Sequence, residues 1–361
     1  MENAGNVNNY VGIDVGKRRL EIVRITKEGE LQRHQTGTTR KELGSLLAWL
    51  KPDDRVVLEA GNLSFMIAKR IRDERRLPVL VLNPGDVATI YKSLKKTDRE
   101  DALKLARLVQ RHPVEELPSV RIPSEEEEGW RRLCSEQAYW SREATKGKNR
   151  LHSLFASAGL THITKKDLAS RKNRERVMSI LPVHYQAEAK RIVTHLGVIE
   201  THLSAIDNDI KAILKEHREY STVVMSLPGI GPVTTLVLLA YLGICERFSH
   251  GKQLGYYAGM VPRVDISGDS VRYGRIISRG CGQLRRVMIQ CANALVRSHC
   301  SGELGLFYER LRCRIGHKKA VVALARKMLE VLFVMIKTGK MYRYATDEFI
   351  NKKLKLYGLA A

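Results

Sequence analysis

Short apolar runs alternate with amphipathic stretches over the first third of the chain. The runs are rich in Val, Ile and Leu and end at Gly, Pro or acidic residues, which is typical of buried strands. Stretches with helical spacing separate the later runs. The pattern predicts helices at 39–50 and 65–75 and strands at 11–15, 20–26, 30–35, 55–58 and 78–82. It therefore predicts a mixed α/β sheet, with ligands at the carboxyl ends of its strands.

Apolar residues recur in steps of three and four over the middle of the chain. A first seam runs from Trp130 to Ala158, and a second seam from Ile192 to Ile213 repeats over three heptads. Ile and Leu in such a repeat predict a coiled coil. We expect the two seams to pair as an antiparallel hairpin within the chain, with its tip free to meet a second subunit. Pairing with the same helix of another copy is the alternative.

Helical spacing continues beyond Tyr220 and predicts a mostly helical domain. Helices are expected at 249–258, 284–296, 304–314 and 319–336. Another, strongly apolar helix follows a turn of four residues, Pro228, Gly229, Ile230 and Gly231. Backbone N–H groups of a glycine-rich turn at a helix start can contact phosphates irrespective of base sequence. A plain packing turn between two helices is the alternative.

These patterns divide the chain into five parts. An α/β domain is expected at 10–112, a linker with three prolines at 113–123 and the coiled-coil region at 124–218. The helical domain follows at 219–345, and a basic C-terminal tail at 346–361. The fold class is therefore α/β plus all-α.

Four acidic residues lie in or beside apolar segments, where a carboxylate must bind a metal, pair with a base or stay protonated. Asp14 lies within a run of β-branched residues, and Glu59 follows the apolar run at 55–58. Asp98 and Asp101 are three residues apart at the head of an amphipathic helix, so they share one helical face. Together they predict an oxygen-only site for Mg²⁺ or Mn²⁺. The alternatives are a buried Asp14 held by backbone amides and two acids that complement a helix dipole.

The stretch from Pro262 to Gly282 lacks helical spacing and is rich in Gly, Ser and Arg, which predicts an ordered loop or short hairpin close to a charged ligand. Ser267, followed by Gly268, offers an uncrowded hydroxyl. A role as an ordinary turn residue is the alternative for this serine. Guanidinium groups that could clamp phosphate oxygens are those of Arg263, Arg272, Arg275 and Arg279.

Charge narrows the class of partner. The 361 residues include 62 Lys and Arg against 39 Asp and Glu, a formal net charge of +23, which predicts a polyanionic partner and above all nucleic acid. The polar start of the chain and the absence of about 18 consecutive apolar residues predict a cytoplasmic protein with no membrane partner. The cysteines form no CxxC pair, so reduced, mostly buried thiols are expected.

The ordered motifs GIDVGK, LEAG, KTDREDA, PGIG and SGDSVRYG followed by ISRG resemble those of the DEDD transposases of insertion sequences, the group that includes the Piv-type DNA invertases. The resemblance extends from Val11 to about Tyr344. The chain departs from many relatives after Glu59, where Ala-Gly-Asn replaces Ala-Thr-Gly.

The resemblance implies a fold and a chemistry. The N-terminal domain would be RuvC-like, with an RNase H-like fold, and Asp14, Glu59, Asp98 and Asp101 would be its metal-binding acids. Ser267 would be the nucleophile of the C-terminal domain, although Ser270 nearby leaves the choice of serine open. The resemblance also implies dimers and tetramers on DNA, composite sites between subunits and a noncoding guide, the bridge RNA.

The sequence thus predicts a DNA transposase or recombinase that cleaves and rejoins strands through a metal-assisted serine. The first alternative is a RuvC-like, metal-dependent endonuclease in which the same acids activate water. An actin-like sugar kinase or ATPase, and a non-catalytic nucleic-acid scaffold, are the others. The kinase class leaves the charge and the coiled coil unexplained, and the scaffold makes the four acids accidental.

Overall fold

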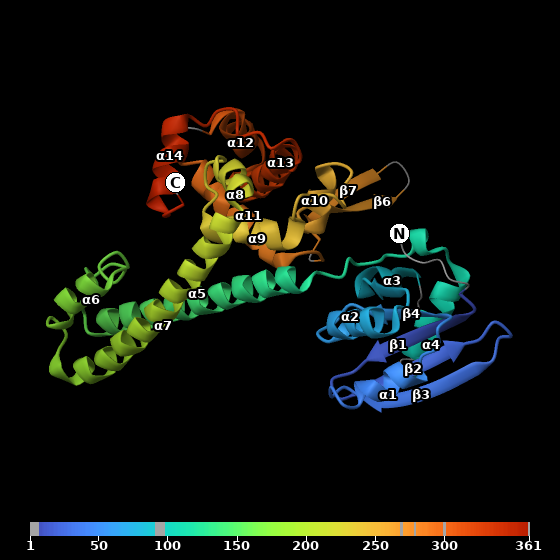
Figure 1. The fold of residues 1–361 in the computed structure, drawn as a ribbon. Coiled ribbons are helices and arrows are strands. Elements are labelled where there is room, and N and C mark those ends of the chain that lie inside the picture. The colour runs from blue at the N-terminus through green and yellow to red at the C-terminus, as the bar shows by residue number, and fades with distance from the viewer. Residues whose placement is uncertain (1–6, 91–97, 268–269, 278, 299–300, 360–361) are drawn as a thin grey trace. The chain divides into compact units, whose positions relative to one another are not determined.

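The computed structural model describes residues 7–90, 98–267, 270–277, 279–298 and 301–359 (Figure 1). The chain divides into two compact units, Met1–Ser124 and Glu125–Ala361. Each unit has its own hydrophobic core and is described by itself.

The first unit is built on a five-stranded mixed sheet with the order β3-β2-β1-β4-β5. The strands are β1 (Asn9–Val15), β2 (Arg19–Ile25), β3 (Leu31–Gly37), β4 (Asp54–Glu59) and β5 (Val79–Leu82). β1, β2 and β3 are antiparallel neighbours, whereas β4 and β5 run parallel to β1. The predicted mixed α/β sheet is confirmed and is consistent with an RNase H-like fold.

Helices cover both faces of this sheet. On one face, α1 (Leu43–Trp49) and α2 (Ser64–Arg75) share a core with alternate residues of β1 and β4 such as Ile13 and Leu58. On the other face, α4 (Asp98–Arg111) packs against β1, β2 and β4, and α3 (Pro84–Ile90) precedes it in the chain. The helix expected at 39–50 is shorter, because Thr39 and Glu42 bond to each other in a turn before it.

The expected linker at 113–123 packs against the sheet. A 3₁₀ turn, Val114–Glu116, leads into Leu117, which is buried in the core beneath α4. Val120 N then donates to Val81 O at 2.6 Å, and Leu82 and Ser119 form an antiparallel bridge. The proline-rich segment therefore lines the outer edge of β5.

The second unit begins with two long antiparallel helices, α5 (Glu125–Ser157) and α7 (Val183–Glu216). Trp130 meets His217 near one end, Trp140 stacks on His202 in the middle, and Arg150 pairs with Glu188 at 2.6 Å toward the other end. The expected hairpin within the chain is confirmed. The charged break between the helices contains a short helix, α6 (Arg171–Met178). Arg174 Nη2 holds it to α7 by donating to both carboxylate oxygens of Glu200 at 2.7 Å.

The C-terminal helices share one core, in which α9 (Pro232–Leu242) is apolar on every side and buried as such a helix must be. α9 packs against α5, α7, α8 (Arg218–Met225) and α11 (Gly282–Leu295). α10 (Lys252–Tyr257) and α12 (Gly302–Ile315) pack against α13 (His317–Thr338), which also contacts α11. Residues expected as a tail form α14 (Asp347–Leu356), whose Ile350 and Leu354 join the same core. None of the described helices has the length and apolar character needed to cross a membrane. The five described cysteines are free thiols.

An exposed two-stranded ribbon interrupts the helices. β6 (Pro262–Ser267) and β7 (Ser270–Ile276) pair antiparallel, with an irregularity in register near Pro262. This ribbon is the short hairpin expected between Pro262 and Gly282.

Candidate active site

Asp14 and Glu59 occupy matching positions at the carboxyl ends of two adjacent parallel strands. β1 pairs with β4 up to Ile13 and Leu58, and the two acids are the next residue on each strand. Matching residues of neighbouring strands project to the same face of a sheet. Both acids are only half-buried, as groups that accept a ligand from solvent should be.

Gly12 explains how α4 approaches these acids. A Cβ on Gly12 would lie 2.0 Å from Ala102 O and 2.6 Å from Ala106 N, so only glycine lets the helix backbone rest on β1. Successive strand residues alternate between faces, and Asp14 therefore projects to the face that α4 covers. Tyr10, at the start of β1, packs near Leu108 in the second half of α4. The first turn of α4 consequently lies toward the Asp14 end of the strand.

That first turn carries the other two predicted acids. Asp98 is the first residue of α4, and Asp101 forms a salt bridge with Lys104. No three Asp, Glu, His or Cys side chains lie within metal-binding reach among those the structure describes. The side chain of Asp98 lies outside the described residues. Metal ligation by these four acids therefore stays a prediction.

Asp54 shows what a purely structural acid looks like in this unit. It is fully buried, and Arg24 donates to both its oxygens, from Nε to Oδ1 at 2.9 Å and from Nη2 to Oδ2 at 2.7 Å. The Arg24 guanidinium also lies 3.7 Å from the centre of the Trp49 ring. Asp14 and Glu59 differ from Asp54 in lying partly open at the end of the sheet.

The serine candidates face each other at the tip of the β6–β7 hairpin. Ser267 ends β6, Ser270 begins β7, and Ser270 Oγ donates to Ser267 O at 3.0 Å. Asp265 and Arg272 pair across the strands on the same face as these serines, because both lie two residues from them. Arg263 Nε donates to Asp265 Oδ1 at 3.0 Å. This face thus combines exposed hydroxyls with two guanidinium groups and the Asp265 carboxylate, which is paired with Arg263.

The other two predicted arginines lie at the base of the hairpin. Arg275 is exposed on β7, and Arg279 is exposed beyond the strand. Arg285, which the sequence did not single out, donates from Nη1 to Ala258 O at 3.1 Å and to Gly259 O and Arg279 O at 3.4 Å. It thereby joins the chain entering the hairpin to the chain leaving it. Its only sequence signal is an arginine on the first turn of a helix after a glycine-rich loop.

The PGIG turn packs closely against protein. Gly229 has φ +86°, and a Cβ there would lie 2.4 Å from Cys291 O on α11. A Cβ on Gly231 would lie 3.6 Å from the Tyr357 hydroxyl. Packing therefore requires glycine at position 229, whereas a Cβ at position 231 would make only ordinary contact. Contact of their N–H groups with phosphate stays a prediction.

Lys353 of α14 forms hydrogen bonds with the backbone directly before this turn. Its Nζ donates to Met225 O, at the end of α8, at 2.6 Å and to Leu227 O, directly before the turn, at 3.1 Å. Burial lowers the pKa of Lys353 from 10.5 to about 8. The signal in the sequence was a lysine in the apolar stripe of Ile350 and Leu354.

We expect a pH-dependent contribution of Lys353 to stability. Between its folded pKa of about 8 and its unfolded value of 10.5, the unfolded chain holds a proton that the folded chain lacks, so the free energy of unfolding rises with pH. Relative to Lys353→Met, wild-type stability should increase by about 2 kcal/mol from about pH 7.5 to about pH 9.5, as urea unfolding of both proteins would measure. The comparison cancels the titration of cysteines and tyrosines. A difference that is constant over this range would contradict the prediction.

Comparison with known proteins identifies the two ends of the chain. Residues 11–159 match the DEDD domain of IS110 transposases, described as "Transposase", and residues 221–309 match the "Transposase IS116/IS110/IS902 family". The first match contains all four predicted acids, and the second contains the PGIG turn and Ser267. The chain belongs to the IS110 family of transposases. It is therefore an enzyme that exchanges phosphodiester bonds of DNA.

Individual relatives of this transposase cover most of its length. The transposase for insertion sequence element IS1111A of Coxiella burnetii is 25% identical over 92% of this chain and 91% of its own. The putative transposase y4rJ of Sinorhizobium fredii is 27% identical over 79% of this chain and 77% of its own. The pilin gene-inverting protein of Moraxella lacunata is 22% identical over 92% of this chain and 97% of its own. Each of these three relatives therefore aligns with most of this chain.

Family membership excludes two of the alternatives. Neither an actin-like kinase nor a non-catalytic scaffold accounts for a chain that matches transposase domains at both ends. A DEDD transposase domain also implies catalysis with a divalent metal. The donor set fits this, because carboxylate oxygens are the ligands that hard divalent cations prefer.

Proposed function

We propose that this transposase cleaves and rejoins DNA strands through a covalent intermediate on Ser267, with Asp14, Glu59, Asp98 and Asp101 holding Mg²⁺ or Mn²⁺. The observation that carries the proposal is the position of Ser267, exposed at the end of a ribbon and on the same face as Arg263 and Arg272. A bound divalent cation would stabilise negative charge on the phosphate oxygens and on the leaving oxygen.

The serine performs the bond exchange in this proposal. Ser267 Oγ forms a bond to phosphorus while the bond to the 3′ oxygen breaks, and the serine proton passes to a base or solvent. The released 3′ oxygen then accepts a proton. Arg263 and Arg272 bind the non-bridging phosphate oxygens and orient the phosphate against the hydroxyl. Rejoining reverses these steps with another 3′ oxygen, so no external energy is needed.

The acids and the serine belong to different units, and the proposal requires both units to reach one phosphate. We propose that the transposase works as a homo-oligomer, a dimer or a tetramer on DNA, in which one site can draw residues from two copies. The long α5–α7 hairpin supports this, because a heptad seam such as that from Ile192 to Ile213 is typical of helices that associate.

We further propose that a noncoding guide RNA, a bridge RNA, selects the DNA. A net charge of +23 supports a large nucleic-acid load. Pairing through RNA would supply the base reading while the protein binds phosphates and shape. Sequencing of RNA that copurifies with the transposase tests this part; nucleic-acid-free protein that recombines DNA with full activity would refute it.

A suicide DNA substrate tests the central proposal. A nick placed next to the scissile phosphate lets a short fragment diffuse away, so that a covalent intermediate cannot religate. We expect an adduct that survives detergent and that mass spectrometry maps to the peptide containing Ser267. Metal-dependent cleavage with free ends and no adduct would instead support the endonuclease that activates water.

A further inference from the structure

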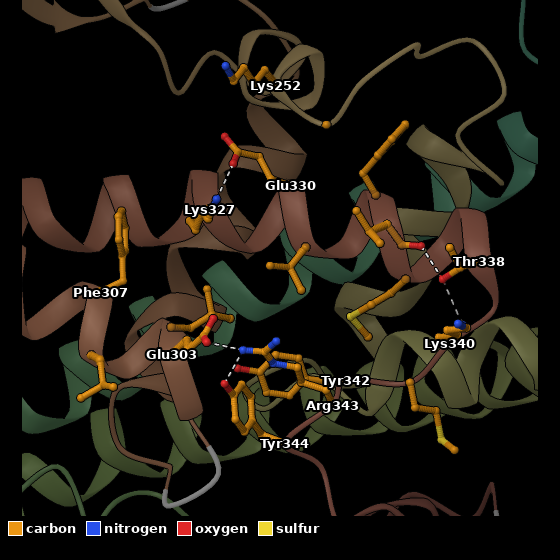
Figure 2. A pocket seen from close by; sticks show the side chains of 18 of the residues that line it. Lys252, Glu303, Phe307, Lys327, Glu330, Thr338, Lys340, Tyr342, Arg343 and Tyr344 are labelled. Carbon is orange, nitrogen blue, oxygen red and sulfur yellow. Dashed lines mark hydrogen bonds and ion pairs between the residues drawn. The ribbon is translucent and has the colours of Figure 1, made fainter.

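A wide groove crosses the C-terminal helices, and no residue of the β6–β7 hairpin lines it. α12 forms one wall, α13 the floor, and the segments 249–252 and 340–344 complete the lining (Figure 2). Its volume of about 1420 Å³ exceeds the roughly 300–1,000 Å³ of small-molecule sites, so it fits a segment of a polymer. Neither the four predicted acids nor Ser267 lines it.

The groove is apolar inside and exposes large side chains to solvent. Leu306 is 66% exposed, Val334 57% and Met341 45%. Phe307 of α12 and Phe333 of α13 are half-buried in the lining. An exposed apolar patch that is rimmed by charged groups is typical of a binding site. Part of each phenyl ring packs against the C-terminal core, and the part open to the groove is aromatic surface on which a nucleobase can stack.

The charge at the rim of the groove is positive. Its acids are already paired: Glu303 with Arg343, Glu309 with Arg312 at 2.9 Å, and Glu330 with Lys327 at 3.0 Å. Further positive charge comes from Lys252, Arg310 and Lys340, which line the same groove. A polyanion therefore meets an attractive field here.

Cations continue from the groove along α12. Phe307, Arg310 and Arg314 are three and then four residues apart, so they share one helical face. The exposed turn into α13 adds His317, Lys318 and Lys319. A backbone of phosphates could follow this row out of the groove.

We infer that the groove binds a segment of single-stranded DNA. Aromatic faces inside a cationic groove are how proteins hold unpaired strands without reading sequence, because every base has a face to stack. In duplex DNA those faces are already stacked on neighbouring bases. DNA is the assigned source because the reaction of a transposase opens DNA strands. The inference rests on that reaction and not on the serine intermediate, so either can fail without the other.

Fluorescence anisotropy with a labelled oligonucleotide of about 12 nucleotides tests the inference, since aromatic-lined cationic grooves hold roughly 4–16 nucleotides. Binding is measured without metal, so cleavage chemistry does not contribute. Phe307→Leu keeps an apolar side chain but loses the stacking face, and should weaken binding about 5- to 100-fold. Tyr139→Leu, which changes an exposed ring on α5, is the matched control and should bind as wild type.

A second variant tests the charges independently. Arg310→Ala with Lys340→Ala should weaken binding and reduce its salt dependence, whereas Lys172→Ala with Arg191→Ala, two exposed cations on α6 and α7, should change binding less. Thermal melting checks that each variant is folded. Unchanged binding in the folded Phe307→Leu protein would overturn the inference. A Phe307→Leu protein that loses binding of an RNA oligonucleotide or of duplex DNA of the same sequence more than it loses binding of the single strand would also overturn it.

Discussion

Asp14→Asn should abolish DNA strand cleavage while leaving the fold intact. The change is nearly isosteric, but it removes the charge at the position on β1 that adjoins Glu59 on β4. Loss of a charged metal ligand costs several kcal/mol of transition-state stabilisation, so cleavage should fall on the order of 10³-fold or more. Gel assays of strand cleavage under single-turnover conditions would measure the loss, with binding of DNA measured separately.

Glu21 provides a matched control for this experiment. It pairs in register with Asp14 on the neighbouring strand β2, and the Gln35 side chain donates to it from β3. Glu21→Gln therefore removes a charge close to Asp14 without touching the predicted ligands, and cleavage should stay within about tenfold of wild type. If Asp14→Asn also stays within tenfold, Asp14 does not hold the metal. Equal losses in both variants would show that general charge near the sheet end matters, and not ligation.

Ser267→Ala should abolish the covalent protein–DNA adduct on a suicide substrate. Without the hydroxyl no bond to phosphorus can form, and recombination should fall on the order of 10⁴-fold or more, as in other enzymes that lose a nucleophile. Ser267→Cys should retain some adduct because a thiolate is also a nucleophile. The readout is the band that resists detergent, followed by mass spectrometry of the adduct peptide.

Ser270→Ala is the matched control for the nucleophile. Ser270 sits opposite Ser267 and donates its hydroxyl hydrogen bond to Ser267 O at 3.0 Å, so its loss should loosen the hairpin tip but preserve the adduct. Loss of the adduct in Ser270→Ala and its retention in Ser267→Ala would move the nucleophile to Ser270. Retention in both single variants and loss in the double variant would mean that either serine can attack.

Local patterning was sufficient for most elements of the fold. The β-branched runs around Asp14 and before Glu59 predicted β1 and β4, because strand residues carry their signal over a few positions. The seam from Ile192 to Ile213 predicted α7, because a repeat in steps of three and four is also a local signal. Patterning was weaker where packing decides. The segment 113–123 looked like a free linker because its prolines break local periodicity, yet its backbone bonds to β5 at the sheet edge. The segment 346–361, predicted as a tail, contains α14, because Ile350 and Leu354 pack into the C-terminal core.

The sequence by itself determined the residue types of the chemistry: four carboxylates, a serine beside arginines, and a charge that demands nucleic acid. Only the tertiary structure decided which of them become neighbours. β1 lies beside β4, which places Asp14 next to Glu59, and Gly12 lets α4 rest on β1 with its first turn toward the Asp14 end. The serines meet because β6 and β7 pair, and Lys353 reaches the PGIG turn from a helix more than 100 residues later in the chain. Local sequence sets backbone preferences over a few residues, whereas adjacency between distant residues depends on how strands pair and helices pack.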